Sequence, residues 1–309
     1  MDRQLRQHQD TLRGHKQLAT HDPISFIVMI SDSIADPNGE YHFVVNRSLN
    51  NASLVCWLNT ESKRCTLSNI KARNQYDKNR FLCFFCSNLF EKLIENEGFT
   101  ALHCACIEKN DRVIALIGER MSGKTTAELM LLNKGYNLIS NDCALFKYNS
   151  EGQHIDVVAV IEDIFIREKS RFFDSTLKSC RDLSIVVHEA EDEGKQNRRM
   201  LLSHSDLARI NKVKWVGKGT LYAIVFPKFN PLVNAIETHR SWVNSRQIIE
   251  KHRVEIGHDS TDFLSSYLGS FSSAEPLMDL ISDIPSFYCE YSERTEDEFC
   301  SFISTFIGG

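Results

Sequence analysis

The sequence has no hydrophobic run long enough to cross a membrane. One of its longest apolar stretches, Ile24-Ser-Phe-Ile-Val-Met-Ile30, is far shorter than the ~20 residues that a spanning helix needs, and it suits a buried strand. The first ten residues are polar and lack the apolar core of a signal peptide. We therefore predict a cytoplasmic protein with no membrane partner.

The sequence also lacks an excess of basic residues. It holds 36 Lys and Arg against 41 Asp and Glu, a formal net charge of -5. Proteins that bind nucleic acid usually carry a basic surface, so we expect no nucleic-acid partner. A local basic pocket for phosphate groups is compatible with this balance. Proline and glycine are scarce, at six and 14 residues in 309, and 42% of residues are hydrophobic, which is typical of a globular protein with a sizeable core.

Cysteine is not scarce, but the ten cysteines do not form a disulfide framework. Cys83 and Cys86 lie in an aromatic run, and Cys104 and Cys106 alternate as residues of a strand do. This pattern favours buried, reduced thiols of a cytosolic protein. A zinc site built from these four cysteines is the alternative.

The pattern of polar and apolar residues predicts three parts. Residues 1–22 are polar and predict a flexible leader, residues 23–100 predict a smaller β-rich region with one helix, and residues 101–309 predict an α/β core. In the β-rich region we expect strands at 24–30, 41–46 and 53–58 and a helix at 78–97. In the core we expect strands at 101–108, 113–117, 136–140, 157–161, 183–188, 221–226 and 287–291, helices at 124–133, 276–281 and 296–307, and a solvated loop at 189–199.

One segment of the core predicts a phosphate-binding loop, or P-loop. Gly118-Glu-Arg-Met-Ser-Gly123-Lys124-Thr125 fits G-x-x-x-x-G-K-[ST] without a gap, after an apolar strand pattern and before a helical one. The glycines let the backbone curl so that successive N–H groups face phosphates, and the helix N-terminus favours the same anion. Lys124 can bridge terminal phosphate oxygens, and the Thr125 hydroxyl can complete a Mg²⁺ shell. The predicted ATP-binding residues are Gly118, Glu119, Arg120, Met121, Ser122, Gly123, Lys124, Thr125 and Thr126.

A carboxylate follows the next predicted strand. Asp142 comes just after residues 136–140, and the carboxyl ends of strands in open α/β sheets converge on the ligand crevice. Phosphoryl transfer needs an acid near the phosphates for the metal or for the proton of the acceptor. Asp142 is therefore the predicted acid, and a helix or turn cap is its structural alternative.

The stretch from Leu102 to Thr126, followed by residues 131–142, resembles HPr kinase/phosphorylase and its relatives. That family has a Leu-His pair opening a hairpin, a phosphate loop, a helix, a turn with glycine and a strand that ends in two acids. The resemblance covers about 40 residues well, and a looser match reaches Ile284–Tyr291. It implies a mixed sheet with flanking helices, of the phosphoenolpyruvate-carboxykinase type, and kinase chemistry on a hydroxyl. Members assemble as hexamers, so a homo-oligomer would agree with it.

The resemblance also implies roles for single residues. His103 matches the active-site histidine, Asp142 the second acid of the pair, and Arg167 an arginine after the following strand. The chain departs from the family at Asn141, which stands where the first acid, the general base, is expected; asparagine cannot accept a proton at neutral pH. Asp142 or His103 could take that task, or the loose transition state needs no strong base.

A second departure concerns the metal. Phe165 stands where the family has a glutamate that binds Mg²⁺, and Glu162 and Asp163 are the nearby substitutes. The predicted Mg²⁺ ligands are Thr125, Asp142 and Glu162.

These residues favour a kinase that moves the γ-phosphate of ATP to a hydroxyl of a peptide, a protein or a small metabolite. Relatives that modify peptide natural products would agree with the divergent pocket. Because Asn141 replaces a base, a nucleotide-binding sensor without transferase activity is the second hypothesis. Adenylyl transfer on the same scaffold is the third.

Overall fold

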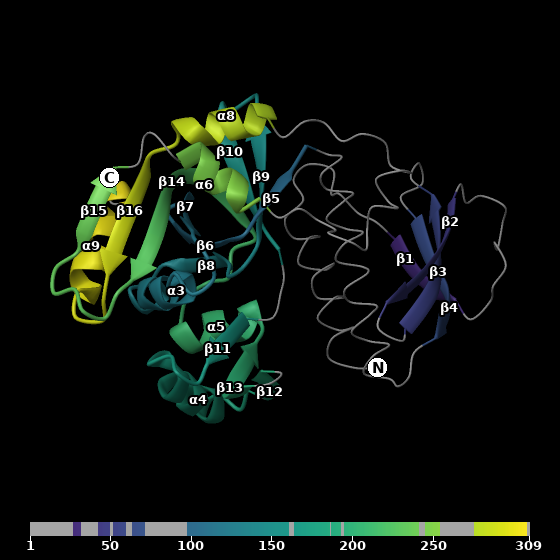
Figure 1. Cartoon of the computed structure of the whole chain (residues 1–309), viewed down its shortest axis with the longest axis horizontal. Helices are drawn as coiled ribbons and strands as arrows, with labels where there is room; N and C mark the ends of the chain where they lie inside the picture. The colour runs from purple at the N-terminus through teal and green to yellow at the C-terminus, as the bar shows by residue number, and fades with distance from the viewer. Residues whose placement is uncertain are drawn as a thin grey trace. The chain divides into compact units, whose positions relative to one another are not determined.

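The computed structural model describes residues 27–31, 43–49, 52–59, 64–71, 98–160, 164–185, 187–192, 195–240, 245–253 and 275–307. The chain divides into two compact units, residues 1–99 with 255–273 and residues 100–254 with 274–309. Strands of both units are drawn in Figure 1.

The first unit contains a four-stranded sheet in the order β1-β4-β3-β2. Its strands are β1 (Ile27–Ser31), β2 (Phe43–Leu49), β3 (Ala52–Asn59) and β4 (Arg64–Lys71). β1 runs parallel to β4, and the other neighbours are antiparallel. The three strands expected in this region overlap β1, β2 and β3. The predicted leader at 1–22 and helix at 78–97 lie outside the described residues, and the division at residues 22 and 100 stays a prediction.

The second unit is built on a large mixed sheet with helices on both faces, as the sequence predicts. Its main path is β5-β9-β10-β14-β7-β6-β8, and β16 joins it through β14 and in turn pairs with β15. β14 is parallel to both β7 and β16. The strands are β5 (Thr100–Leu102), β6 (Cys104–Lys109), β7 (Arg112–Ile117), β8 (Asn137–Ser140), β9 (Ala144–Asn149), β10 (His154–Ala159), β14 (Lys218–Phe229), β15 (Glu237–Arg240) and β16 (Ser286–Tyr291).

The two faces of this sheet are separated by the alternation of side chains along each strand. On β7, Ile114 and Leu116 belong to one buried cluster, and Val113, Ala115 and Ile117 belong to the other. The hairpin from β6 to β7 turns at two residues in the left-handed region, with φ 57° and 63° at positions 110 and 111, as the polar turn predicts.

Each buried cluster is covered by its own helices. α3 (Lys124–Asn133), α5 (His204–Asn211) and α9 (Glu296–Ile307) contribute to the first cluster. α6 (Ser245–Lys251) and α8 (Glu275–Asp283) contribute to the second, and in Figure 1 they lie together on one side of the sheet while α3 lies on the other. The sheet is therefore the middle of three layers, and α3 ends at a left-handed glycine, Gly135 (φ 82°), as predicted.

A second, three-stranded sheet in the order β11-β13-β12 corrects two expectations. It consists of β11 (Ile164–Arg167), β12 (His188–Asp192) and β13 (Lys195–Leu202), next to helix α4 (Phe172–Asp182). The solvated loop expected at 189–199 is wrong, because most of that range is paired strand. The strand expected at 183–188 is also wrong, because Leu183 caps α4 and Ser184 is left-handed (φ 54°). Antiparallel backbone pairing outweighs the polar composition here.

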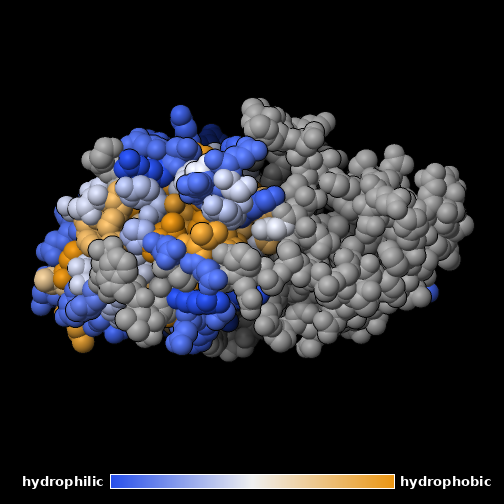
Figure 2. Space-filling model, turned by 90° about the horizontal axis from the view of Figure 1, so that it is seen from above, coloured by the Kyte–Doolittle hydropathy of each residue, from blue (hydrophilic) through white to orange (hydrophobic). Residues whose placement is uncertain are grey.

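The surface of the second unit is mostly hydrophilic in the view of Figure 2, with hydrophobic residues toward the middle of the visible face. None of the helices in the described part of the chain is long and apolar enough to cross a membrane.

Candidate functional site

The loop from Gly118 to Gly123 connects β7 to α3, as the sequence predicts. It curls on itself, because the Ser122 N–H donates to the Glu119 carbonyl at 3.1 Å. The curl is tight, since a Cβ atom added at Gly118 would lie 2.6 Å from Ser122 Oγ. Two residues of the loop have left-handed backbones, Met121 at φ 70° and Gly123 at φ 103°.

Two strands from far along the chain hold this curl in place. The Phe229 N–H, at the end of β14, donates to the Ser122 carbonyl at 2.8 Å. The Tyr291 hydroxyl, at the end of β16, donates to the Gly123 carbonyl at 2.7 Å. A Cβ atom at Gly123 would lie 2.7 Å from both Phe229 Cβ and the Tyr291 hydroxyl oxygen. Position 123 therefore requires glycine for its backbone angle and for its space.

The N-terminus of α3 is left open toward the loop. It has no side-chain cap and no acid in its first turn. The Ala127 N–H donates to the Gly123 carbonyl at 2.8 Å, and the three N–H groups before it have no partner within the helix. Ser122 Oγ is also buried without a hydrogen-bond partner. Unpaired donors at a helix N-terminus, next to a curled loop, are the groups that bind an anion. The residues present therefore fit a phosphate chain.

The Lys124 ammonium lies over the same loop. Its side chain is largely buried, and Nζ donates to the carbonyls of Gly118 at 2.7 Å and Glu119 at 3.2 Å. Burial lowers the pKa of Lys124, and the nearby Asp142 carboxylate opposes that shift. Lys124 thus brings a partly desolvated positive charge to the place where the motif requires one.

The predicted acid and its neighbours lie beside the start of α3. The Thr125 hydroxyl donates to Asn141 Oδ1 at 3.4 Å. His103, in the link between β5 and β6, has Nδ1 3.4 Å from Asp142 Oδ1. The Cys104 N–H donates to the Asp142 carbonyl at 3.1 Å, which ties the histidine link to the end of β8. The structure therefore brings His103, Thr125, Asn141 and Asp142 together.

The surroundings of His103 favour its neutral form. Burial lowers its pKa from 6.5, and Asp142 opposes that shift, while the positive charges of Lys124 and Arg120 lower the pKa further. At pH 7 the imidazole is therefore mainly uncharged. A neutral imidazole whose Nδ1 carries its proton toward Asp142 has an open lone pair on Nε2.

Arg167 and Phe165 are on a strand of the other sheet. Arg167 ends β11 in the three-stranded sheet. Glu162 and Asp163 lie outside the described residues. Phe165 is on β11 with 43% of its surface exposed. The roles of Arg167 and Glu162 therefore stay predictions.

The cysteine pair near the loop is buried. Cys104 Sγ and Cys106 Sγ are 3.6 Å apart, and burial raises the pKa of Cys104 well above its ordinary value. Among the residues that the structure describes, no group of three or more His, Cys, Asp or Glu side chains could hold a metal ion. Cys83 and Cys86, the other half of the zinc alternative, lie outside the described residues.

Sequence reasoning missed three residues of the site. Glu128, on α3 one turn after Lys124, is fully buried, and neither carboxyl oxygen has a hydrogen-bond partner. Its spacing from the lysine, i and i+4, was the signal that could have found it. His252, just after α6, stacks against His103 with ring centroids 6.3 Å apart. No local pattern marks His252 or Tyr291, because both reach the site only through the fold.

Comparisons with known proteins add little to this geometry. No family model matches the chain, and no curated protein matches it. The Hpr(Ser) kinase/phosphatase from Coxiella burnetii is among the solved structures that it resembles, at 11% identity and a TM-score of 0.29, covering 67% of this chain and 93% of the other. That score is too low to establish a shared fold. What can be said of function therefore depends on the site's own residues.

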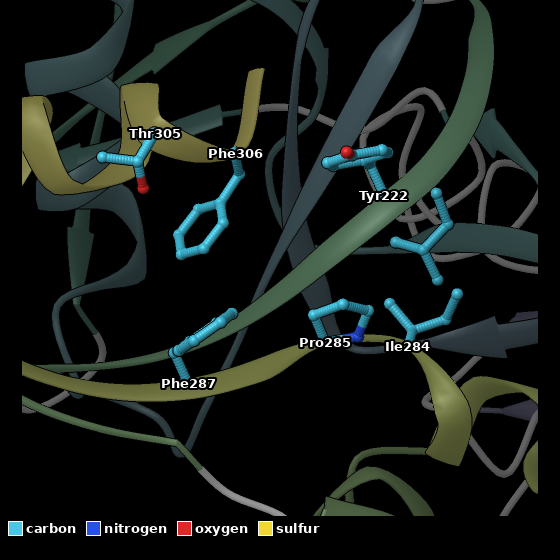
Figure 3. A pocket seen from close by; sticks show the side chains of 7 residues that line it. Tyr222, Ile284, Pro285, Phe287, Thr305 and Phe306 are labelled. Carbon is cyan, nitrogen blue, oxygen red and sulfur yellow. The ribbon is translucent and has the colours of Figure 1, made fainter. Parts of the chain in front are cut away.

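A pocket of about 490 Å³ lies away from this site. It is lined by residues near the starts of β14 and β16, including Tyr222 and Phe287, together with Phe306 of α9 (Figure 3). The loop contacts the other ends of these parallel strands, at Phe229 and Tyr291. Phe229 is seven residue steps along the strand from Tyr222, roughly 20 Å. The pocket is therefore no part of the candidate site.

Proposed function

We propose that this chain is a kinase that binds ATP with Mg²⁺ and transfers the γ-phosphate to a hydroxyl acceptor. In this proposal the residues from Gly118 to Thr126 bind the nucleotide. Thr125 and Asp142 hold the metal, with Glu162 as a third ligand. His103 receives the proton of the acceptor.

The observation that carries the proposal is the open N-terminus of α3 beside a half-buried histidine–carboxylate pair. The uncapped amides and Lys124 supply positive charge for the phosphates, and they are fixed before any ligand arrives. Bound Mg²⁺ would neutralise charge on the phosphate oxygens. Lys124 would exchange its two loop carbonyls for phosphate oxygens, which are stronger, charged acceptors.

The pair His103–Asp142 supplies the base that Asn141 cannot. Asp142 orients the ring through Nδ1, and the lowered pKa of His103 keeps Nε2 free to accept a proton. Asn141 has a different task, because its amide oxygen accepts the Thr125 hydroxyl and so orients it. The departure at position 141 is then compatible with transferase chemistry.

The acceptor is a hydroxyl of a peptide, a protein or a small metabolite, and the protein works in the cytoplasm. No membrane or nucleic-acid partner is part of the proposal. A homo-oligomer is compatible with it.

The test compares Lys124→Ala with Lys134→Ala. Both remove one lysine from the ends of α3, but Lys134 lies at the far end, where it is exposed and pairs with Asp297. We expect Lys124→Ala to weaken binding of a fluorescent ATP analogue and to lower ADP formation by roughly two orders of magnitude. Lys134→Ala should match the wild type in both. Equal binding by the wild type and Lys124→Ala would refute the site.

The nucleotide product separates the proposal from its alternatives. ADP with a labelled acceptor supports the kinase. AMP with pyrophosphate would replace it by adenylyl transfer. Tight ATP binding without any labelled product, across peptides and metabolites, would leave the sensor, the hypothesis that Asn141 motivates.

A further inference from the structure

The end of α6 is fastened to the strand link that carries His103. The His252 carbonyl accepts the His103 N–H at 2.8 Å. The neighbouring residues Leu102 and Arg253 also pair, as an isolated antiparallel β-bridge. His252 is itself fixed, because its N–H donates to the carbonyls of Ile248 at 3.2 Å and Ile249 at 2.9 Å. The backbone of His103 is thus held by a helix end from another part of the chain.

The side chains of the two histidines also pack together. Their ring centroids are 6.3 Å apart and their planes differ by 23°. That distance is within the range of paired aromatic rings. His252 is only 7% exposed, so its ring is packed beside His103 and is not a mobile surface group. The His103 ring therefore has His252 as one neighbour and the Asp142 carboxylate as another.

The same helix end reaches the nucleotide loop. Lys251 Nζ forms an ion pair with the Glu119 carboxylate. Both side chains are mostly exposed, so the pair adds little stability. It does show that consecutive residues, Lys251 and His252, contact the loop on one side and the proposed proton acceptor on the other. His252 therefore sits between the nucleotide and acceptor parts of the site.

We propose that His252 is a positioning residue for His103, holding its ring so that Nδ1 faces Asp142 and Nε2 faces the acceptor hydroxyl. The inference rests on the proposed role of His103 in phosphoryl transfer. His252 contributes through its ring, which prevents the His103 ring from rotating, while its carbonyl fixes the His103 backbone. A small loss of orientation in a reacting group costs a large factor in rate, which gives such a residue its effect.

The first test needs no nucleotide. Long-range ¹H–¹⁵N spectra of histidine-labelled protein show which ring nitrogen carries the proton, and His103→Gln identifies the His103 signals. We expect the wild type to hold one tautomer at His103, protonated at Nδ1, and His252→Ala to show both tautomers. His252→Phe keeps an aromatic ring at this position, so its His103 spectra should resemble those of the wild type. Identical His103 signals in the wild type and His252→Ala would overturn the proposal.

The second test is a double-mutant cycle on ADP formation from ATP and Mg²⁺, with water as the acceptor. His252→Ala should lower kcat roughly tenfold and leave the KM for ATP within about twofold, and His252→Phe should recover most of the loss. In a His103→Ala background, His252→Ala should cause no further decrease. Independent, multiplying losses would show that His252 does not act through His103.

The matched control is Glu250→Ala, an exposed position of the same helix end. It should give wild-type spectra and rates. If Lys124→Ala leaves ADP formation unchanged, the kinase proposal fails, and the His103 spectra still decide the role of His252. If the spectra fail while Lys124→Ala abolishes turnover, only the His252 proposal falls.

Discussion

Glu128 gives the sharpest test of the electrostatics beside the candidate site. Its carboxyl group is fully buried on α3, and neither oxygen has a hydrogen-bond partner. Burial raises the pKa of Glu128 well above its ordinary 4.5, and the negative charge of Asp142 raises it further. The folded protein therefore keeps a proton on Glu128 at pH values where the unfolded chain has lost it.

The sign of the effect follows from proton counting. Above about pH 4.5 the unfolded state binds one proton fewer at this position than the folded state. The free energy of unfolding then falls as pH rises, by about 1.4 kcal/mol for each pH unit, until the pKa of the folded state is reached. Below pH 4.5 both states are protonated and the effect is absent.

Glu128→Gln removes this dependence. Glutamine has nearly the same shape and does not ionise, so the variant should gain on the wild type by about 1.4 kcal/mol per pH unit through that window. That gain is roughly tenfold in the folding equilibrium per unit. The measurement is urea unfolding, followed by circular dichroism, at steps of half a pH unit or so from about pH 4 upward.

Glu108 supplies the matched control. It is also a buried glutamate, but it accepts hydrogen bonds from the Asp111 N–H and from Asn137 Nδ2. Glu108→Gln should therefore lose stability, by about 1–3 kcal/mol, because one accepted bond is broken. Asp142→Asn removes a negative charge that raises the pKa of Glu128, so it should narrow the pH range over which the free energy of unfolding falls. Parallel pH profiles for the wild type and Glu128→Gln would refute the assigned charge state.

Four further outcomes follow from the site. The kcat for ADP formation should fall only at acid pH, below 6.5, because burial lowers the pKa of His103; a fall that sets in above 6.5 would contradict a neutral base. Gly123→Ala should lower the free energy of unfolding by at least the ~1–2 kcal/mol of a left-handed alanine, and it should abolish nucleotide binding. Tyr291→Phe should lower the free energy of unfolding by about 1 kcal/mol, because one hydrogen bond is lost. Urea unfolding and titration with an ATP analogue measure both variants. Lys251→Ala should leave Tm unchanged, since its ion pair with Glu119 is exposed; a clear drop in Tm would assign the pair a structural role.

The local parts of the site could be predicted from the sequence. The strand, the curled loop and the helix occupy consecutive residues, so apolar runs, glycine and the lysine–threonine pair were enough to place them. Placing Asp142 beside the loop needed one more rule, the convergence of strand ends in α/β sheets. In the structure Asp142 follows β8, its Oδ1 lies 3.4 Å from His103 Nδ1, and its charge raises the pKa of Lys124.

The non-local parts could not be predicted in the same way. β14 was expected only at 221–226, but it extends over 12 residues because β10, β7 and β16 each pair with a different part of it. Strand β13 pairs with both β11 and β12, and polar composition does not reveal this pairing. His252 reaches His103 through the packing of α6, and nothing in its neighbouring residues indicates that contact.

The two hydrogen bonds that hold the loop have a consequence for synthesis of the protein. The loop residues leave the ribosome early, but their supports, Phe229 and Tyr291, are made more than 100 and 160 residues later. Contacts between such distant residues form late in folding, because a long chain must first close. A nascent chain that stops before β16 would carry the whole nucleotide motif without the hydroxyl that fixes its last glycine. If the loop binds nucleotide as proposed, the affinity of a nascent chain for nucleotide would rise once β16 joins the sheet.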